Sequence, residues 1–411
     1  MNHAPERLER APAVYFILIT VALDTMGAGL LIPVLPGLIA HLTGEGLTRA
    51  AVYGGSMAAL FAAMQFFAAP LLGSLSDHLG RRPVLLLSLA AFGVSYLLMA
   101  FASSLLWLYL SQACAGLFGA TTATAGAYLA DITPEQQRAH RFGLTGAAFG
   151  TGIIIGPMLG GLLTGIGPRV PFYCAAGLAL VNVIYGALVL PESLPLAHRR
   201  PFAWARSHVL GAINALRPLP IVFPVLGAVL LIRIALQTIP ATWPYFSMQR
   251  FGWNERDVGY SLGLYGLFSI VGQGLLVGLL TRRFGPKGTV IFGLLMAIAG
   301  FIGFTLAFNG VVAIAFVVPS ALGFMSGPSM TGLMSMHTPS GQQGELQGAI
   351  ASIGSVAMML TPPMMTGIYS HFASPGSARY FPAAPYAAAA LLSVASLALF
   401  IIAMKRSESR T

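Results

Sequence analysis

Two ionisable side chains, Asp24 and Arg233, lie deep inside long apolar stretches of the sequence. Every other acidic residue, lysine and arginine falls in a tail, in a loop or at the end of an apolar stretch. A charge in an apolar medium costs at least about 2.5–3.5 kcal/mol on membrane-insertion scales, so such a residue indicates function. A carboxyl group there can take up and release a proton, and a guanidinium group can act as its counter-ion.

Asp24 and Arg233 lie at similar depths in their segments, and we expect both to face a central cavity where they approach each other. Burial favours the neutral form of a carboxyl group, whereas a nearby guanidinium favours the ionised form. A conformational change that separates the two would therefore load a proton, and one that joins them would release it. Two alternatives stay open: a static pair that fixes helix packing, and an Arg233 that binds an anionic group of a ligand.

The composition predicts a chain that lies mostly in a membrane. Of its 411 residues, 56% are hydrophobic and only 8% are charged, against about 25% charged in soluble domains. The net charge of +10 comes from basic residues at the edges of apolar segments. Since no basic stripe alternates with exposed aromatic residues, we expect no nucleic-acid partner.

Apolar segments between polar breaks predict an all-α protein with twelve transmembrane helices, because open sheets and loops cannot face lipid. The first segment is too long for the apolar core of a signal peptide. The predicted spans are 13–40, 50–75, 83–102, 105–130, 142–166, 170–190, 218–245, 257–281, 287–308, 310–335, 345–370 and 379–404.

The basic residues predict the orientation. Most of the 22 lysines and arginines fall on the side of the two termini, which the positive-inside rule assigns to the cytoplasm. The opposite side carries only Arg49, Arg169, Arg250, Arg256 and Arg379.

A glycine- and arginine-rich loop after the second span, 73–83, recurs in altered form after the eighth span, 278–287. Six spans separate the copies, which predicts two parallel repeats with a binding site near the midplane between them. We therefore expect a first bundle over 1–190, a basic cytoplasmic linker over 191–217 and a second bundle with a short tail over 218–411. The linker is either an interfacial helix or a solvated loop.

The first loop resembles the cytoplasmic signature of the major facilitator superfamily through Gly73, Asp77, Gly80, Arg81 and Arg82. The resemblance implies that fold, and it implies a charge-assisted contact that forms in one state and breaks in another. The alternative is a simple positive-inside anchor with a helix cap.

The fifth span resembles the helix motif of drug/proton antiporters in the same superfamily. Its matching residues are Gly143, Gly152, Gly156, Pro157, Gly160 and Gly161. Small residues let helices approach closely, and proline allows a kink. The alternative is generic small-residue packing.

Four regions resemble the tetracycline-resistance branch of these antiporters: 23–27 with 33–36, 83–89 with 96–101, 250–254, and 342–348. Three positions depart from it. Those pumps carry acids where this chain has Ser95 and Ala299, and an arginine where it has Gln112. These departures leave tetracycline itself in question as a substrate, although they do not affect the fold.

Other polar residues within the spans are candidates to line a cavity, although each could equally join two helices. They are Gln65, Gln112, Gln237, Trp243 and Gln273. Cys114 and Cys174 both lie in apolar segments and suggest neither a disulfide nor a metal site. With no paired-histidine or nucleophilic-serine motif, we expect no enzyme, no catalytic residue and no metal.

The resemblance implies a proton-coupled antiporter that exports a drug-like amphipathic compound by alternating access, with tetracycline as a candidate. The alternative is export of a sugar or another small metabolite. The proton gradient would be the energy source, without a cofactor. The expected partners are the substrate, protons and lipid. We expect a monomer in the bacterial inner membrane with both termini in the cytoplasm.

Overall fold

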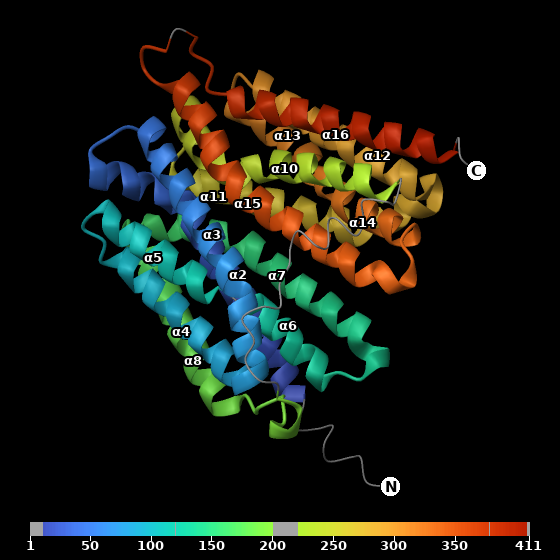
Figure 1. Ribbon diagram of the computed structural model, residues 1–411. Coiled ribbons are helices and arrows are strands. Elements are labelled where there is room, and N and C mark those ends of the chain that lie inside the picture. The colour runs from blue at the N-terminus through green and yellow to red at the C-terminus, as the bar shows by residue number, and fades with distance from the viewer. Residues whose placement is uncertain (1–10, 120, 200–220, 378, 409–411) are drawn as a thin grey trace. The chain divides into compact units, whose positions relative to one another are not determined.

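The computed structural model describes residues 11–119, 121–199, 221–377 and 379–408, and every regular element among them is helical (Figure 1). The all-α prediction is therefore confirmed. The predicted linker 191–217 is described only as far as residue 199, where a short helix η1, Leu196–His198, follows the first bundle. The rest of the linker lies outside the described residues.

The first half of the chain forms long helices joined by short turns. They are α2 (Ala11–Thr43), α3 (Leu47–Leu79), α4 (Arg81–Ala100), α5 (Leu105–Phe118), α6 (Thr121–Ile132), α7 (Glu135–Thr164) and α8 (Val170–Val189).

The second half follows the same pattern with short irregular helices at its breaks. Its elements are α10 (Val222–Phe251), α11 (Glu255–Val271), η2 (Gly272–Leu276), α12 (Val277–Leu306), α13 (Gly310–Leu322), η3 (Gly323–Met325), α14 (Ser326–Met336), η4 (Ser340–Gln342), α15 (Gln343–Ala373) and α16 (Ala384–Glu408).

Ten helices of the described chain are long and apolar enough to cross a membrane, so the twelve-span count stays a prediction. Two local features account for the difference. The predicted span 105–130 is divided into α5 and α6 at Gly119, which leaves each part short. The predicted spans eight and nine form one continuous helical stretch, Glu255–Leu306, which kinks at Gly285 with a positive φ of 72°.

The contacts divide the chain into two compact units. The first contains residues 1–44, 60–206 and 255–263, and the second contains 45–59, 207–254 and 264–411. The division cuts through α3 and α11, so each unit includes a helix segment from the other half of the sequence. The expected bundle boundaries at 190 and 218 stay a prediction.

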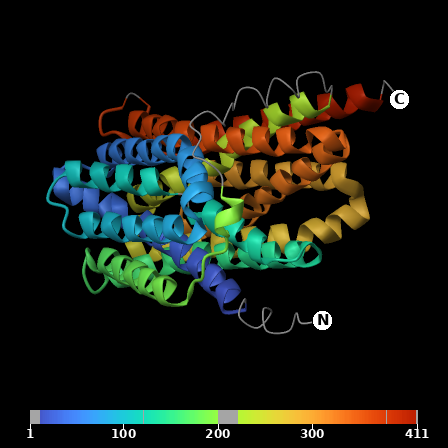
Figure 2. The same cartoon turned by 60° about the horizontal axis from the view of Figure 1, so that its bottom comes forward.

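In the first unit, α2 packs against α7 and α8, and α4 packs against α8 (Figures 1 and 2). A buried cluster from α2, α4 and α6 includes Phe16, Ile17, Leu85 and Tyr128. This cluster holds α2 beside the helices that carry the polar residues of the site.

The glycines of α7 allow its backbone to approach α2. A Cβ atom on Gly152 would meet the Ala22 carbonyl oxygen at 2.6 Å, and one on Gly156 would meet that of Met26 at the same distance. A Cβ on Gly160 would overlap the Leu30 carbonyl. Close packing is thus a role of the central glycines in the predicted motif, whereas Gly143 faces open space.

In the second unit, α10 packs against α15 and α16, and α12 packs against α13 and α16 (Figure 2). An aromatic cluster fills the junction of α10, α12 and α16. The Trp243 ring centroid lies 4.7 Å from that of Phe304 and 6.1 Å from that of Tyr386. Trp243 is only 1% exposed, so its ring is part of this core, and its predicted place in the lining of a cavity stays a prediction.

The Gly160→Ala substitution should destabilise the protein, because the added Cβ meets backbone that cannot rotate away. Overpacking of this kind costs about 1–3 kcal/mol, and thermal unfolding of the purified protein in detergent measures it. Gly143→Ala is the matched control, because its Cβ meets nothing within 4 Å and alanine is the better helix former by about 1 kcal/mol. Equal unfolding temperatures for the two variants would contradict the close approach of α7 to α2.

Candidate functional site

Asp24 lies in the middle of α2 and faces a small pocket inside the first unit. The walls come from α2, α4 and α8 and consist of Leu23, Asp24, Leu89, Phe92, Tyr96, Ala175, Ala179 and Asn182. Apolar side chains dominate this lining, with Tyr96 and Asn182 as the other polar members. We expected Asp24 to face a central cavity; the pocket that it lines is internal to the first bundle.

One face of α2 presents the polar groups of this pocket. Thr20, Asp24 and Gly27 follow one another at helical spacings of four and three residues, so they share that face. The Thr20 hydroxyl donates a hydrogen bond of 3.0 Å to Asn182 Oδ1 of α8. A side chain on Gly27 would overlap the Tyr96 hydroxyl, so this glycine makes room for the phenol beside Asp24.

Asp24 has no ionic partner among the described residues of its own unit. Ion pairs in the described chain join Arg81 and Arg199 to Asp77, Asp131 and Glu192. A carboxylate without a partner in apolar surroundings is costly unless it is neutralised. The pocket therefore suits a carboxyl group that exchanges a proton.

Arg233 lies in α10 and belongs to the second unit. Its side chain is exposed, while Ile232, Ala235 and Leu236 on other faces of the helix are buried. Gln237 follows one turn later on the face of Arg233. Arg233 and Gln237 thus lie on one face of α10. The predicted pair between Asp24 and Arg233 stays a prediction.

The remaining polar candidates have different local roles. Gln65 of α3 donates a hydrogen bond of 2.8 Å to the Gly119 carbonyl, at the break between α5 and α6. Gln112 is half-buried in α5. Gln273 is exposed within the π-helical turn η2, a distortion that often occurs at functional sites.

The substituted positions Ser95 and Gln112 lie close together. Ser95 is buried, and its hydroxyl donates a hydrogen bond of 3.0 Å to the carbonyl of Ser111, the residue before Gln112. Ala299 is half-buried in α12.

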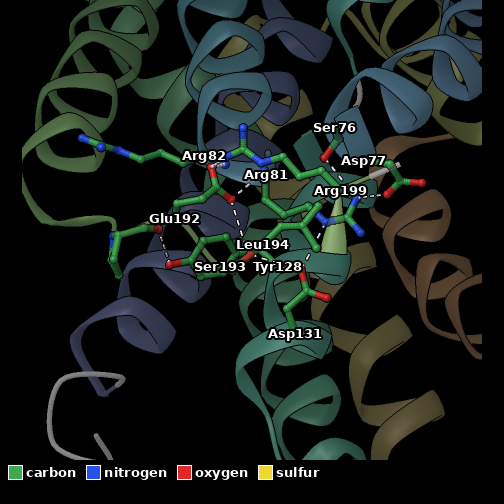
Figure 3. A network of polar contacts seen from close by, with 11 residues as sticks. Ser76, Asp77, Arg81, Arg82, Tyr128, Asp131, Glu192, Ser193, Leu194 and Arg199 are labelled. Atoms are coloured by element: carbon green, nitrogen blue, oxygen red, sulfur yellow. Dashed lines mark hydrogen bonds and ion pairs between the residues drawn. The ribbon is translucent and has the colours of Figure 1, made fainter. Parts of the chain in front are cut away.

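A second polar site surrounds the turn between α3 and α4 (Figure 3). Gly80 has φ of 111° and separates the two helices, and the left-handed region is accessible to glycine at little cost. The guanidinium of Arg81 lies 2.6 Å from Asp77 Oδ1 and 3.2 Å from Asp131 Oδ2 at the end of α6. It also donates to the Ser76 hydroxyl.

Glu192, which follows α8, closes this site from the other side. Its carboxylate accepts hydrogen bonds from the backbone N–H groups of Arg81 at 2.8 Å and Arg82 at 3.3 Å. These are unpaired donors at the positive end of the α4 dipole, where a carboxylate is favoured. A Cβ on Gly80 would overlap the same carboxylate, so this glycine serves the contact as well as the turn.

Further contacts join α6 and α8 to the turn. The Ser193 hydroxyl donates to Asp131 at 3.1 Å, and the Tyr128 hydroxyl donates to the Pro191 carbonyl at 2.8 Å. Arg82 donates to the Ala187 carbonyl at 2.5 Å. We call the set Ser76, Asp77, Arg81, Arg82, Asp131, Glu192 and Ser193 the α3–α4 network.

Sequence reasoning found Asp77, Arg81 and Arg82 but missed Asp131 and Glu192. Both acids fall at ends of apolar segments on the side of the membrane assigned to the arginine-rich loop. That shared side is the signal that could have found them, since unlike charges at one membrane face can pair. The structure brings the network together in one state; its opening in another state stays a prediction.

Comparison with known proteins agrees with this architecture. The family model of the Major Facilitator Superfamily matches residues 17–362. "Tetracycline resistance protein, class C" of Escherichia coli is 36% identical over 362 residues, which cover 88% of this chain and 91% of the relative. The class B protein of Escherichia coli is 36% identical over 359 residues, 86% and 88% of the two chains.

Among solved structures, a bacterial homologue of the human lysosomal transporter Spinster, in an inward-facing and occupied conformation, has a TM-score of 0.79. The match covers 96% of this chain and 97% of the homologue, at 15% sequence identity. A likeness at this identity shows the fold alone. Family, relatives and fold agree with the resemblance in the sequence. The chain is a multi-pass membrane transporter, not an enzyme, and belongs to the major facilitator superfamily.

Proposed function

We propose that the protein is a proton-coupled antiporter that exports tetracycline or a similar amphipathic compound from a bacterial cell. The observation that carries the proposal is a membrane carboxyl, Asp24, in a largely apolar pocket of a chain that is 36% identical to tetracycline resistance proteins. The proton gradient supplies the energy without a cofactor. The protein acts as a monomer in the inner membrane, with both termini in the cytoplasm.

Asp24 is the proton carrier in this proposal. The neutral carboxyl group costs less free energy than a carboxylate beside the apolar side chains of Leu23, Leu89 and Phe92. Opening of the pocket to water, or the approach of Arg233, favours loss of the proton. Substrate and proton then move in opposite directions if one conformational change requires bound substrate and the reverse change requires a protonated Asp24.

The α3–α4 network is the proposed cytoplasmic gate. Its interactions join α3, α4, α6 and the segment after α8 in the state observed here. Opening this side separates some of these charged groups, and charge-assisted hydrogen bonds of this kind are the stronger ones. The network thus stabilises the state in which it is formed, and substrate or proton binding must offset that preference.

Uptake of labelled tetracycline into everted membrane vesicles tests the proposed function. Accumulation that depends on an imposed proton gradient, acid inside, is the expected result. The control is the same vesicle without the gradient. If folded, inserted protein accumulates no tetracycline and a broad panel of amphipathic drugs gives the same result, the alternative, export of a sugar or another metabolite, replaces drug export.

The Asp24→Asn substitution should abolish accumulation against a gradient, because the amide cannot carry a proton. Asp24→Glu is the matched control, since it retains the carboxyl group and should keep part of the activity. Both are measured by gradient-driven uptake in everted vesicles and by tetracycline binding to the purified protein. Full gradient-driven uptake by Asp24→Asn would contradict the role of Asp24.

The Glu192→Gln substitution should weaken the α3–α4 network, because it removes the charge that caps α4. A loss of about 1.4 kcal/mol changes a conformational equilibrium tenfold, so we expect the labelling rate of a single cysteine next to the turn to change by about that factor.

Leu79→Cys in a Cys114→Ser, Cys174→Ser background provides the cysteine to be labelled. Ser193→Ala, which removes one neutral donor from Asp131, is the control and should change labelling less. Equal effects of the two variants would contradict the gate.

A further inference from the structure

The second copy of the loop carries a cation at one position where the first copy carries an acid. When Gly73 and Gly80 are aligned with Gly278 and Gly285, Arg282 takes the position of Asp77. In the first copy, Arg81 pairs with Asp77 and Asp131, and Glu192 caps the following helix. Within the described residues, none of the ion pairs involves Arg282 or Arg283. The second copy therefore presents guanidinium groups that form no ion pair with a carboxylate of the described residues.

These arginines continue an exposed apolar strip on the same helix. Leu275 is 67% exposed and Leu279 is 61% exposed, and Arg282 and Arg283 follow Leu279 by three and four residues, so they share its face. Both arginines are exposed. Phe284, which is 58% exposed, lies next to the strip, with the Arg283 guanidinium 5.5 Å from its ring centroid.

The strip ends at a kink in the helix, between two predicted spans. Gly285 kinks the continuous helical stretch with φ of 72°, and the next predicted span begins at Lys287. Exposed leucines on a membrane-spanning helix face acyl chains, and arginines one turn further along lie at the depth of the headgroups. Guanidinium groups bind phosphate oxygens in a bidentate manner.

We propose that Leu275, Leu279, Arg282, Arg283 and Phe284 form a binding site for an anionic phospholipid, such as phosphatidylglycerol. The lipid phosphate contacts the two guanidinium groups, and its acyl chains lie along the leucines and Phe284. The apolar strip selects a lipid over a soluble phosphate. In the first copy of the loop, carboxylates of the chain neutralise the arginine. In the second copy, the lipid phosphate supplies that negative charge. The site is independent of the proposed transport substrate.

Titration of the purified protein with phosphatidylglycerol in detergent tests the proposal, with bound lipid measured by native mass spectrometry. We expect phosphatidylglycerol to bind more tightly than phosphatidylcholine and glycerol phosphate to compete poorly. The Arg282→Gln, Arg283→Gln double variant should bind phosphatidylglycerol about tenfold to thirtyfold more weakly, since each basic residue near an anionic lipid contributes a factor of about five.

Arg138→Gln, Arg250→Gln is the matched control, because it removes the same charge from two exposed arginines outside the strip. It should retain the affinity of the wild type. If the glutamine variant does not fold, Arg282→Lys, Arg283→Lys keeps the charge and should bind with intermediate affinity. The proposal is overturned if the Arg282→Gln, Arg283→Gln variant binds the lipid as tightly as the wild type or, where that variant does not fold, if the lysine variant does. It is also overturned if the control loses as much affinity as the strip variant, or if glycerol phosphate competes as well as the lipid.

Discussion

The cost of a charge in an apolar medium governs the arrangement of this protein. The chain has only 8% charged residues, and nearly all of them are at helix ends, where water, lipid headgroups or opposite charges are available. Asp24 and Arg233 are the exceptions. Helix packing serves this arrangement, because the glycines of α7 hold the α2 backbone close, while Thr20 and Gly27 orient the face of α2 that carries Asp24 toward α4 and α8.

The ends of the helices obey the same constraint in a different way. Around the turn between α3 and α4, carboxylates from two distant parts of the chain surround the cation and the helix N-terminus. A network of this kind is stable when all its members are paired, and it is costly when some of them are left unpaired. This property suits a contact that forms in one conformation and breaks in another. In the altered second copy, Arg282 and Arg283 form no ion pair within the described part of the chain, and we propose that lipid supplies the matching negative charge.

Local patterns in the sequence predicted much of this arrangement. Apolar runs predict helices because only helices satisfy the backbone in lipid, and the spacing of Gly152, Gly156 and Gly160 predicts a close helix contact. Partners distant in the sequence were not predictable in the same way: Asp131 and Glu192 reach Arg81 through the fold. The burial of Trp243 was not predictable either, because an indole has both a polar and an apolar part, and only the packing of α10 against α12 and α16 places its ring in the core.

The central claim is that Asp24 alternates between a protonated and an ionised state in step with substrate. Proton release from the purified, weakly buffered protein on addition of tetracycline, followed with a pH-indicator dye, tests this claim most directly. We expect release of protons by the wild-type protein, and none by an Asp24→Asn variant that still binds the drug. Equal release by both proteins would contradict it, because the proton would then come from another group.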